Sequence, residues 1–245
     1  MVFVAMRLLF VALLGLCSCG YFYYAEPISP VQGQALPLDV HDDGSILFTQ
    51  GRFEVRVRPM TDEELNRRFE SMSSEGRKST NPYTFGNAER PVQETKGRFT
   101  VFLLTVKNYE YPKILIDPAR ISLEADNGRD YWALDLQQLS SYYRAYALGF
   151  AGNEYARLRE RTDMLNRTMY QKEMLFSGQE TEGYLVFPSL HPDVTALTMT
   201  ILDAITRFDY RDEPVESMDI SYRFEREVGR IYRDGTRRQT ASGSP

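Results

Sequence analysis

Apolar and polar residues alternate through residues 45–59, which is the pattern of a β-strand with one face turned to a core. Phe53, Val55 and Val57 fall on one face of that strand. The other face carries Arg52, Glu54, Arg56 and Arg58. A second, strongly apolar strand is predicted over 99–108. It ends on an asparagine, a residue type that favours turns.

Further strands follow, and two of them are joined by a very short turn. Asn127-Gly128 tolerates the positive backbone angles of a tight hairpin between strands at 121–125 and 131–134. The remaining strand-like segments are 114–116, 183–187, 194–202, 204–210 and 218–225. Short strands separated by turn residues predict an antiparallel β-sandwich.

Residues 135–173 interrupt the strand pattern, because apolar residues recur there at intervals of three and four. The first stripe is Leu136, Leu139, Tyr143, Tyr146 and Phe150. The second stripe is Tyr155, Leu158, Thr162, Leu165 and Met169. Two such stripes joined by a glycine-bearing break predict a helical hairpin inserted into the sandwich.

Residues 45–96 are expected to combine a strand, a short helix and a long loop. Thr61 and Glu64 have the spacing of a capping box, which predicts a helix running to about Ser71. Residues 71–94 are rich in Ser, Gly, Asn and Pro and predict a long surface loop. A loop of that length is more often functional or disordered than inert.

The N-terminus has the features of an export signal. An apolar run over 8–16 is shorter than the roughly 20 residues needed to span a bilayer. Leu16-Cys17-Ser18-Cys19 resembles the lipobox of bacterial lipoproteins. We therefore expect 1–18 to be removed as a signal peptide and Cys19 to carry lipid, since the peptidase cuts after a small residue. Ordinary cleavage at the same place, which leaves a free thiol, is the alternative.

The segments that flank the expected domain have the composition of irregular chain. Residues 19–44 contain several prolines and predict an extended tether between the lipid and the folded body. Residues 227–245 are basic, end in small polar residues and predict a disordered tail. Gly20, in place of the aspartate of an inner-membrane retention signal, favours the outer membrane, with the protein facing the periplasm.

Several motifs occur in an informative order between residues 97 and 226. A strand ends in Val106-Lys107-Asn108, the Asp126-Asn127-Gly128 hairpin follows, and Ser177-Gly178-Gln179-Glu180 precedes a strand at 183–188. This order resembles the immunoglobulin-like domains of unknown function on bacterial lipoproteins, apart from the insertion 135–173 and a serine where proline is usual. The resemblance implies an extracytoplasmic β-sandwich and no active site.

Cysteine content and charge exclude several classes of function. The chain has two cysteines, Cys17 and Cys19, so the mature domain has no disulfide, no cysteine zinc cluster and no Cys–His catalytic pair. It depends on a hydrophobic core, which about 200 residues of this composition can supply. The formal net charge is −5, and loss of Arg7 with the signal makes it about −6. We expect no nucleic-acid partner, because such a partner calls for a basic surface.

Catalytic and metal-binding motifs are sparse. The two histidines are His41 and His191, and the sequence has no Gly-x-Ser-x-Gly nucleophile motif. The His191-Pro192-Asp193 tripeptide also occurs in J-domains between two helices, but here it links two strands and predicts a turn. Residues 41–43 lack further metal ligands, and 126–130 lack the glutamate that a calcium loop requires. We therefore expect no catalytic residues, no metal and no cofactor.

These observations favour a lipid-anchored cell-envelope protein that acts as a non-catalytic binding or assembly module for an envelope protein partner. The candidate docking residues are Tyr142, Tyr143, Arg144, Arg157 and Arg161 of the predicted hairpin. The simpler alternative is that the stripes only pack the helices and the charges are only solvated. A further alternative is an envelope hydrolase, or a small-ligand carrier, with a site near 71–94.

Overall fold

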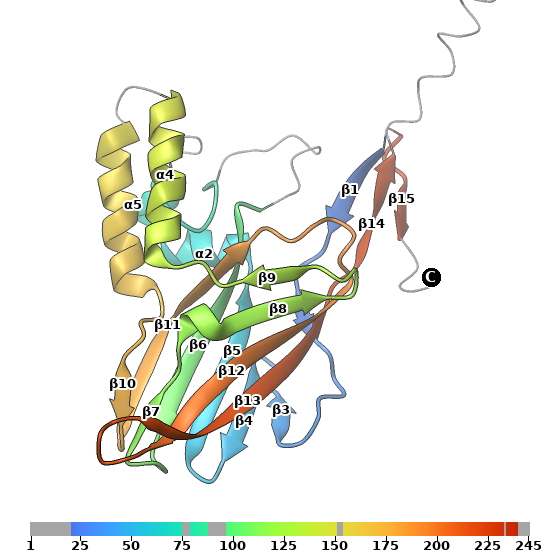
Figure 1. Ribbon diagram of the computed structural model, residues 1–245. Coiled ribbons are helices and arrows are strands. Elements are labelled where there is room, and N and C mark those ends of the chain that lie inside the picture. Colours follow the sequence, from blue (N-terminus) through green and yellow to red (C-terminus); the bar gives the residue numbers. More distant parts are fainter. Residues whose placement is uncertain (1–20, 75–78, 88–96, 151–153, 233, 240–245) are drawn as a thin grey trace, which may run out of the picture.

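The computed structural model describes residues 21–74, 79–87, 97–150, 154–232 and 234–239. This part of the chain is mainly β, as the sequence predicted, and its strands form three antiparallel sheets of five, seven and three strands (Figure 1). Cys17 and Cys19 lie outside the described residues.

The five-stranded sheet has the order β11-β6-β5-β4-β3. Its strands are β3 (Leu38–Val40), β4 (Ile46–Gln50), β5 (Phe53–Met60), β6 (Phe99–Asn108) and β11 (Gln179–Pro188). Strands β5 and β6 pair although some 40 residues separate them, and β11 lies on the other side of β6 along its whole length.

The seven-stranded sheet follows the order β10-β7-β12-β13-β2, with β8 and β9 attached to β12 through β8. Its strands are β2 (Ser29–Pro30), β7 (Lys113–Leu115), β8 (Ile121–Ala125), β9 (Asp130–Trp132), β10 (Met174–Phe176), β12 (Ala196–Phe208) and β13 (Pro214–Glu225). A single-turn helix, η2 (Pro118–Arg120), precedes β8.

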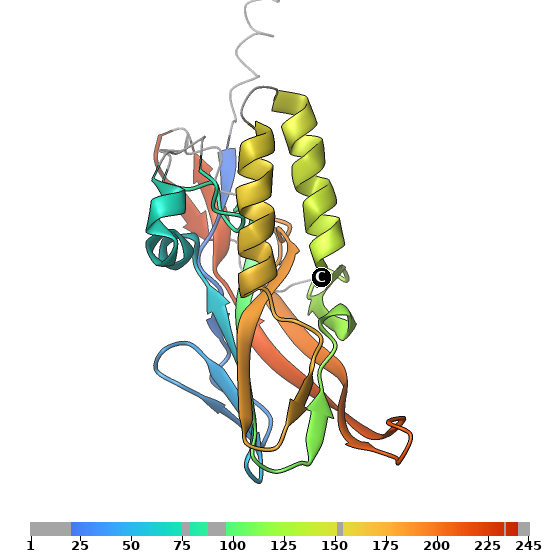
Figure 2. The same cartoon turned by 90° about the vertical axis from the view of Figure 1, so that its left-hand side faces the viewer.

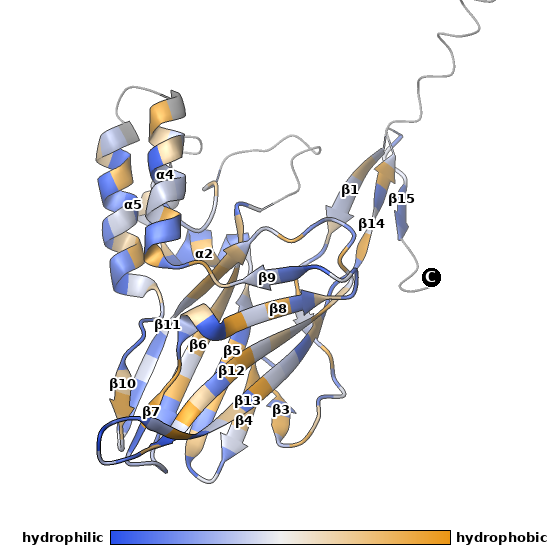
Figure 3. Ribbon diagram, in the orientation of Figure 1, coloured by the Kyte–Doolittle hydropathy of each residue, from blue (hydrophilic) through white to orange (hydrophobic). Residues whose placement is uncertain are grey.

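The inner faces of these two sheets meet in one hydrophobic core. Phe53, Val55 and Val57 of β5 are completely buried, while Glu54 and Arg56 between them are only partly buried. Met199 and Tyr222 lie in the same core from the seven-stranded sheet. Hydrophobic and hydrophilic positions alternate along these strands (Figure 3), which is how a period of two places every second side chain in the core.

A second hydrophobic cluster lies on the outer face of the five-stranded sheet, where α2 (Asp62–Arg68), α4 (Leu136–Phe150) and α5 (Glu154–Thr168) pack against it (Figure 2). The short helix α3 (Glu70–Ser73) follows α2. Val101 and Tyr184 of the sheet pack in this cluster with Leu139 and Leu165 of α4 and α5. The first half of β6 is therefore covered on both faces, which explains its continuous apolar sequence, whereas Thr105 and Lys107 on the outer face of its second half are partly exposed.

The sequence predicted a surface loop over 71–94, but residues 71–73 belong to α3 and most of residues 79–87 are buried. Tyr83 is completely buried, and its ring centroid lies 4.9 Å from that of Tyr184. Asn81 is also completely buried, and its amide nitrogen donates to Ser73 Oγ at 2.9 Å while its amide oxygen accepts from the Tyr83 N–H at 2.9 Å. Because its polar groups are paired, this segment can fill the space between sheet and helices.

The third sheet joins the two ends of the chain. β1 (Tyr21–Ala25) pairs with β14 (Val228–Tyr232), which also pairs with β15 (Arg237–Gln239). We call these three strands the arm. The tether predicted over 19–44 instead contains β1, β2 and β3, and the disordered tail predicted over 227–245 contains β14 and β15. Pairing between strands some 200 residues apart leaves no signal in the local composition of either one.

Two local predictions are confirmed. Thr61 caps α2, because its Oγ1 accepts from the Glu64 N–H and the Glu64 carboxylate accepts from the Thr61 N–H. Gly128 has φ +74°, and its N–H donates to the Ala125 carbonyl in the turn between β8 and β9.

Candidate binding groove

Two adjoining hollows lie at the end of the molecule that carries the arm. The larger one, with a volume of about 560 Å³, lies beside α4 and is lined by Tyr142, Arg98 and Gln138. We call it the Tyr142 groove. The smaller one, of about 260 Å³, lies beside the arm and is lined by Tyr24; we call it the Tyr24 pocket. The two hollows share Gly97, which precedes β6, Phe99 at the start of β6, and Ser189, which follows β11.

Aromatic rings form much of the wall of the Tyr142 groove. Tyr142 projects from α4, with 41% of its surface exposed, and its ring centroid lies 5.2 Å from that of Phe99 at the start of β6. Phe85 from the buried 79–87 segment also lines the groove. Such rings offer apolar area at a small cost in conformational entropy, which suits recognition of another chain.

Arg98 places a positive charge in this aromatic wall. It is 8% exposed, and its guanidinium carbon lies 4.5 Å from the centroid of the Phe85 ring and 5.4 Å from that of Tyr143. One terminal nitrogen donates to the Tyr143 hydroxyl at 3.0 Å. Within the described part of the chain no carboxylate pairs with Arg98, and its Nε has no hydrogen-bond partner. The wall therefore favours anionic groups and hydrogen-bond acceptors.

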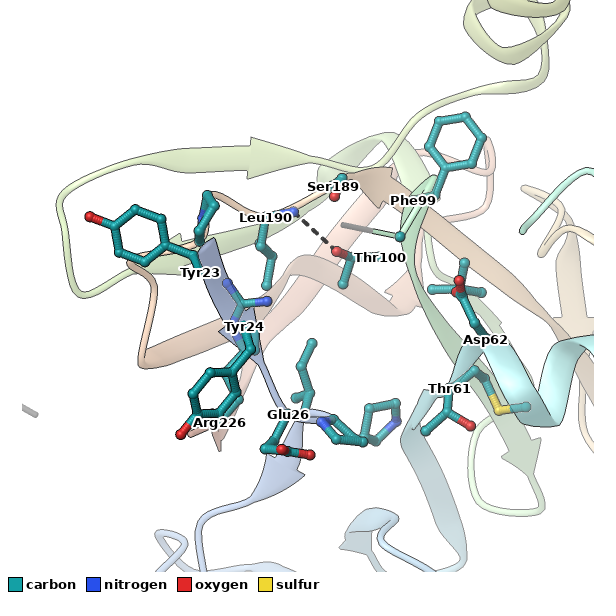
Figure 4. Close-up of a pocket in the computed structure, with 18 residues that line it drawn as sticks. Tyr23, Tyr24, Glu26, Thr61, Asp62, Phe99, Thr100, Ser189, Leu190 and Arg226 are labelled. Carbon is teal, nitrogen blue, oxygen red and sulfur yellow. Dashed lines mark hydrogen bonds between the residues drawn. The ribbon is translucent and has the colours of Figure 1, made fainter. Parts of the chain in front are cut away.

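The Tyr24 pocket is lined by polar groups that already bond within the protein (Figure 4). Arg226 donates from Nε to the Val194 carbonyl at 2.8 Å, and Thr100 Oγ1 accepts from the Leu190 N–H at 3.3 Å. The Tyr24 hydroxyl donates to Glu227 at 2.8 Å, and this bond, followed by burial, raises the pKa of Tyr24. The Arg226 bond joins the base of the arm to the body, whereas the Tyr24–Glu227 bond lies at the base of the arm itself. Because these groups are already paired, few polar atoms remain for a ligand.

The structure separates the five docking residues predicted from the sequence. Tyr142 and Arg144 are exposed and Arg157 is partly buried. Tyr143 and Arg161 are completely buried, so their prediction as exposed docking residues is wrong.

The burial of these two residues has a clear cause in the 79–87 segment. Tyr143 donates its hydroxyl hydrogen to the Pro82 carbonyl, and a terminal nitrogen of Arg161 donates to the Ser79 carbonyl at 2.8 Å. Burial raises the pKa of Tyr143 to about 12. Sequence reasoning missed Arg98, Phe85 and Phe99 as groove residues, and the only signal was a pair of aromatic residues, Tyr83 and Phe85, in an otherwise polar stretch.

The residues around His191 form a turn. His191 Nδ1 hydrogen-bonds Asp193, which also accepts from the Asn127 amide at 2.8 Å. Although burial acts to raise it, these hydrogen bonds hold the pKa of Asp193 below its usual value. Among the residues that the structure describes, no Ser or Thr hydroxyl is hydrogen-bonded to the His191 ring. Asp126 lies in the neighbouring turn between β8 and β9. Its carboxylate accepts from the backbone N–H groups of Thr195 and Ala196, which joins that turn to the start of β12.

No three His, Cys, Asp or Glu side chains gather in a metal-binding arrangement within the described ranges. His41 lies in the turn between β3 and β4, where its N–H donates to the Ser45 carbonyl at 2.9 Å. None of the described helices has both the length and the apolar character needed to cross a membrane.

Comparison with known proteins gave no family model, no curated protein and no solved structure that matches the chain.

Proposed function

We propose that this chain is a lipid-anchored, non-catalytic binding module of the bacterial cell envelope. It is held at the outer membrane by lipid on Cys19 and faces the periplasm. In this proposal its body is an immunoglobulin-like β-sandwich in which residues 135–173 form an inserted helical hairpin. The apolar run, the small Ser18 before Cys19 and the resemblance to lipoprotein domains support the location and the fold class.

The observation that carries the binding function is the Tyr142 groove. Its wall combines exposed aromatic surface from Tyr142 with the cationic Arg98, and Phe99 at the start of β6 also lines it. Aromatic residues and arginines dominate the energetics of protein interfaces. The groove therefore suits an envelope protein that presents an apolar or aromatic side chain next to an acidic group.

A photo-reactive phenylalanine analogue in place of Tyr142 tests this proposal in intact cells. We expect it to capture one discrete partner, because the side chain lies in the wall of the groove. The matched control replaces Tyr210, which is 86% exposed in the turn between β12 and β13, with the same analogue. Capture of the same species at both positions would contradict the proposal.

Ser189→Trp serves as a blocking variant, because Ser189 is partly exposed and lines both hollows. We expect it to abolish capture at position 142 without changing the denaturation midpoint by more than a small amount. The lipid is tested separately: Cys19→Ala should abolish acyl labelling and release the protein from membranes.

The hydrolase alternative is tested through His191. The other histidine, His41, lies in the turn between β3 and β4. A hydrolase that uses His191 would lose activity in the His191→Ala variant. A turn residue would affect only stability, which is our expectation from its contacts with Asp193 and the neighbouring hairpin.

A further inference from the structure

The arm extends from the body at the end where the described chain begins (Figure 1). Its first residue, Tyr21, pairs with Tyr232 near the end of β14. Cys19 precedes Tyr21 by two residues, and two residues of fully extended chain span at most about 7 Å. The headgroup layer of a bilayer is about 5–7 Å thick on each side. Lipid on Cys19, which belongs to the proposed function, therefore brings the tip of the arm to the headgroups.

One face of the arm has the composition of a membrane-surface contact. The register of β1, β14 and β15 places the alternate residues Tyr21, Tyr23, Arg230, Tyr232 and Arg238 on this face. We call it the Tyr–Arg face. Tyr21 is 37% and Tyr23 39% exposed. On the opposite face Tyr24 is only 7% exposed, and its hydroxyl donates to Glu227 at 2.8 Å. Tyr23 also lines the Tyr24 pocket, so the Tyr–Arg face is partly exposed where it adjoins the body.

Arginines and tyrosines are in direct contact on this face. The guanidinium carbon of Arg230 lies 4.5 Å from the ring centroid of Tyr21 and 5.6 Å from that of Tyr23. The guanidinium carbon of Arg238 lies 5.4 Å from the ring centroid of Tyr232. The described residues of the three strands and their connecting turn, 21–25, 228–232 and 234–239, contain three arginines and one aspartate. Glu26 and Glu227 flank these strands, and Glu26 pairs with Arg237 at 3.6 Å. The positive charge relevant to the Tyr–Arg face is therefore that of Arg230 and Arg238.

We infer that the Tyr–Arg face binds the anionic surface of a phospholipid bilayer, in addition to any attachment through lipid. Tyrosine rings favour the headgroup level of a membrane, where one end of the ring is apolar and the other is wet. Arginine pairs with lipid phosphates through two parallel hydrogen bonds and is attracted to the negative surface potential. Both the charge of the face and the short connection to Cys19 favour a bilayer over a soluble partner.

Vesicle sedimentation of residues 20–245, made without lipid, tests this inference. This chain retains every residue that the structure describes. We expect it to sediment with vesicles that contain phosphatidylglycerol and to remain in solution with pure phosphatidylcholine vesicles. Arg230→Glu combined with Arg238→Glu should reduce the partition coefficient by about 30-fold or more, because each basic residue near an anionic surface contributes to binding.

The matched control reverses the charges of Arg207, near the end of β12, and Arg211, in the turn that joins β12 to β13. Arg211 also stacks on an exposed tyrosine, with its guanidinium carbon 5.1 Å from the Tyr210 ring centroid. We expect this pair of substitutions to change partitioning less than three-fold. An equal loss of vesicle partitioning in both double variants would overturn the inference, because binding would then depend on the net charge of the whole protein and not on the Tyr–Arg face. Arg230→Lys with Arg238→Lys should retain binding, which separates loss of charge from damage to the arm.

Depth-dependent quenching gives a second, independent readout. In a Trp132→Phe background, the Tyr21→Trp variant should be quenched by lipids that carry the quencher at headgroup level, and the Tyr210→Trp variant should not. Absence of vesicle binding by the folded wild-type chain would overturn the inference. The inference would also be overturned if the Tyr–Arg face substitutions left vesicle binding intact but abolished capture at Tyr142. That result would mean that the face binds a protein partner and not the bilayer. Acyl labelling of Cys19 and capture at Tyr142 test the proposed function without depending on vesicle binding.

Discussion

Replacing Gly183 with alanine tests how the helices are held against the sheet. Gly183 lies in β11, opposite the chain that leaves α5. A Cβ at this position would lie 2.4 Å from both the Cα and the N of Tyr170 and 2.8 Å from the carbonyl carbon of Met169. These are backbone atoms, so a rotamer change cannot relieve the clash. The end of α5 must move away from β11 by about 1 Å to restore an ordinary contact.

The magnitude follows from two contributions. Overpacking of a well-packed site costs about 1–3 kcal/mol. The movement also lengthens the hydrogen bond from the Tyr170 N–H to the Tyr184 carbonyl, now 3.0 Å, and a typical hydrogen bond contributes about 1 kcal/mol. We therefore expect Gly183→Ala to lower the free energy of unfolding by about 2–4 kcal/mol. Urea denaturation followed by far-ultraviolet circular dichroism measures this difference.

Gly33→Ala is the matched control, because the nearest atom to its added Cβ is a terminal nitrogen of Arg223 at 3.9 Å, an ordinary contact. We expect a change below about 1 kcal/mol, of either sign. Equal effects of the two substitutions would refute the reasoning. They would mean that the chain after α5 adapts to a side chain at position 183 without loss of packing.

Three other predictions concern stability. Asn108→Ala should lower the free energy of unfolding by about 2–4 kcal/mol in urea denaturation, because the buried amide donates to the Tyr111 and Leu175 carbonyls and accepts from the Tyr111 N–H. Thr61→Ala should cost about 1 kcal/mol in the same assay, through loss of the helix cap. Tyr143 has a pKa of about 12 in the folded chain and about 10 when unfolded. Its contribution to stability is therefore full below pH 10 and falls as pH rises toward 12. Melting temperatures from pH 8 to 11 should fall less steeply for Tyr143→Phe than for the wild type.

Each of these has a result that would contradict it. A loss below about 1 kcal/mol for Asn108→Ala would mean that water replaces the amide. An unchanged helix signal and stability in Thr61→Ala would mean that α2 is held by packing alone. Identical slopes against pH for Tyr143→Phe and wild type would mean that Tyr143 ionises normally in the folded chain.

Features that depend on neighbours in the sequence could be predicted. The alternation around Val55, the turn at Gly128 and the cap at Thr61 all occur as expected, because each depends on a few consecutive residues. The first helical stripe also identified buried positions correctly, since Leu139 and Tyr143 are both completely buried. The prediction of Tyr143 as an exposed docking residue conflicted with this periodicity, and the periodicity was the better guide.

Features that depend on distant pairing could not be predicted. Tyr21–Ala25 is rich in aromatic residues that favour strands, but nothing in its local sequence identifies Val228–Tyr232 as its pairing partner. Arg161 belongs to the charged sequence of α5, which predicted an exposed side chain. The 79–87 segment instead covers it, and the Ser79 carbonyl accepts a hydrogen bond from it. The serine, asparagine and proline content of that segment predicted a solvated loop. The same residues can also form a buried segment when their polar groups are hydrogen-bonded, and composition does not distinguish the two cases. The Tyr142 groove is formed by α4, the start of β6 and the end of β11 together, and no local pattern combines them.

Because strand β1 begins two residues after Cys19, an acylated form of this protein would have almost no flexible linker between the lipid and the folded domain. A long tether lets a domain search a volume around its anchor, whereas this body would diffuse only within the plane of the membrane. The Tyr24 pocket is lined by the arm itself and shares three residues with the Tyr142 groove. A binding partner would therefore be met at a fixed height close to the bilayer, so proteins resident in the same membrane would encounter the groove far more often than proteins dissolved in the periplasm.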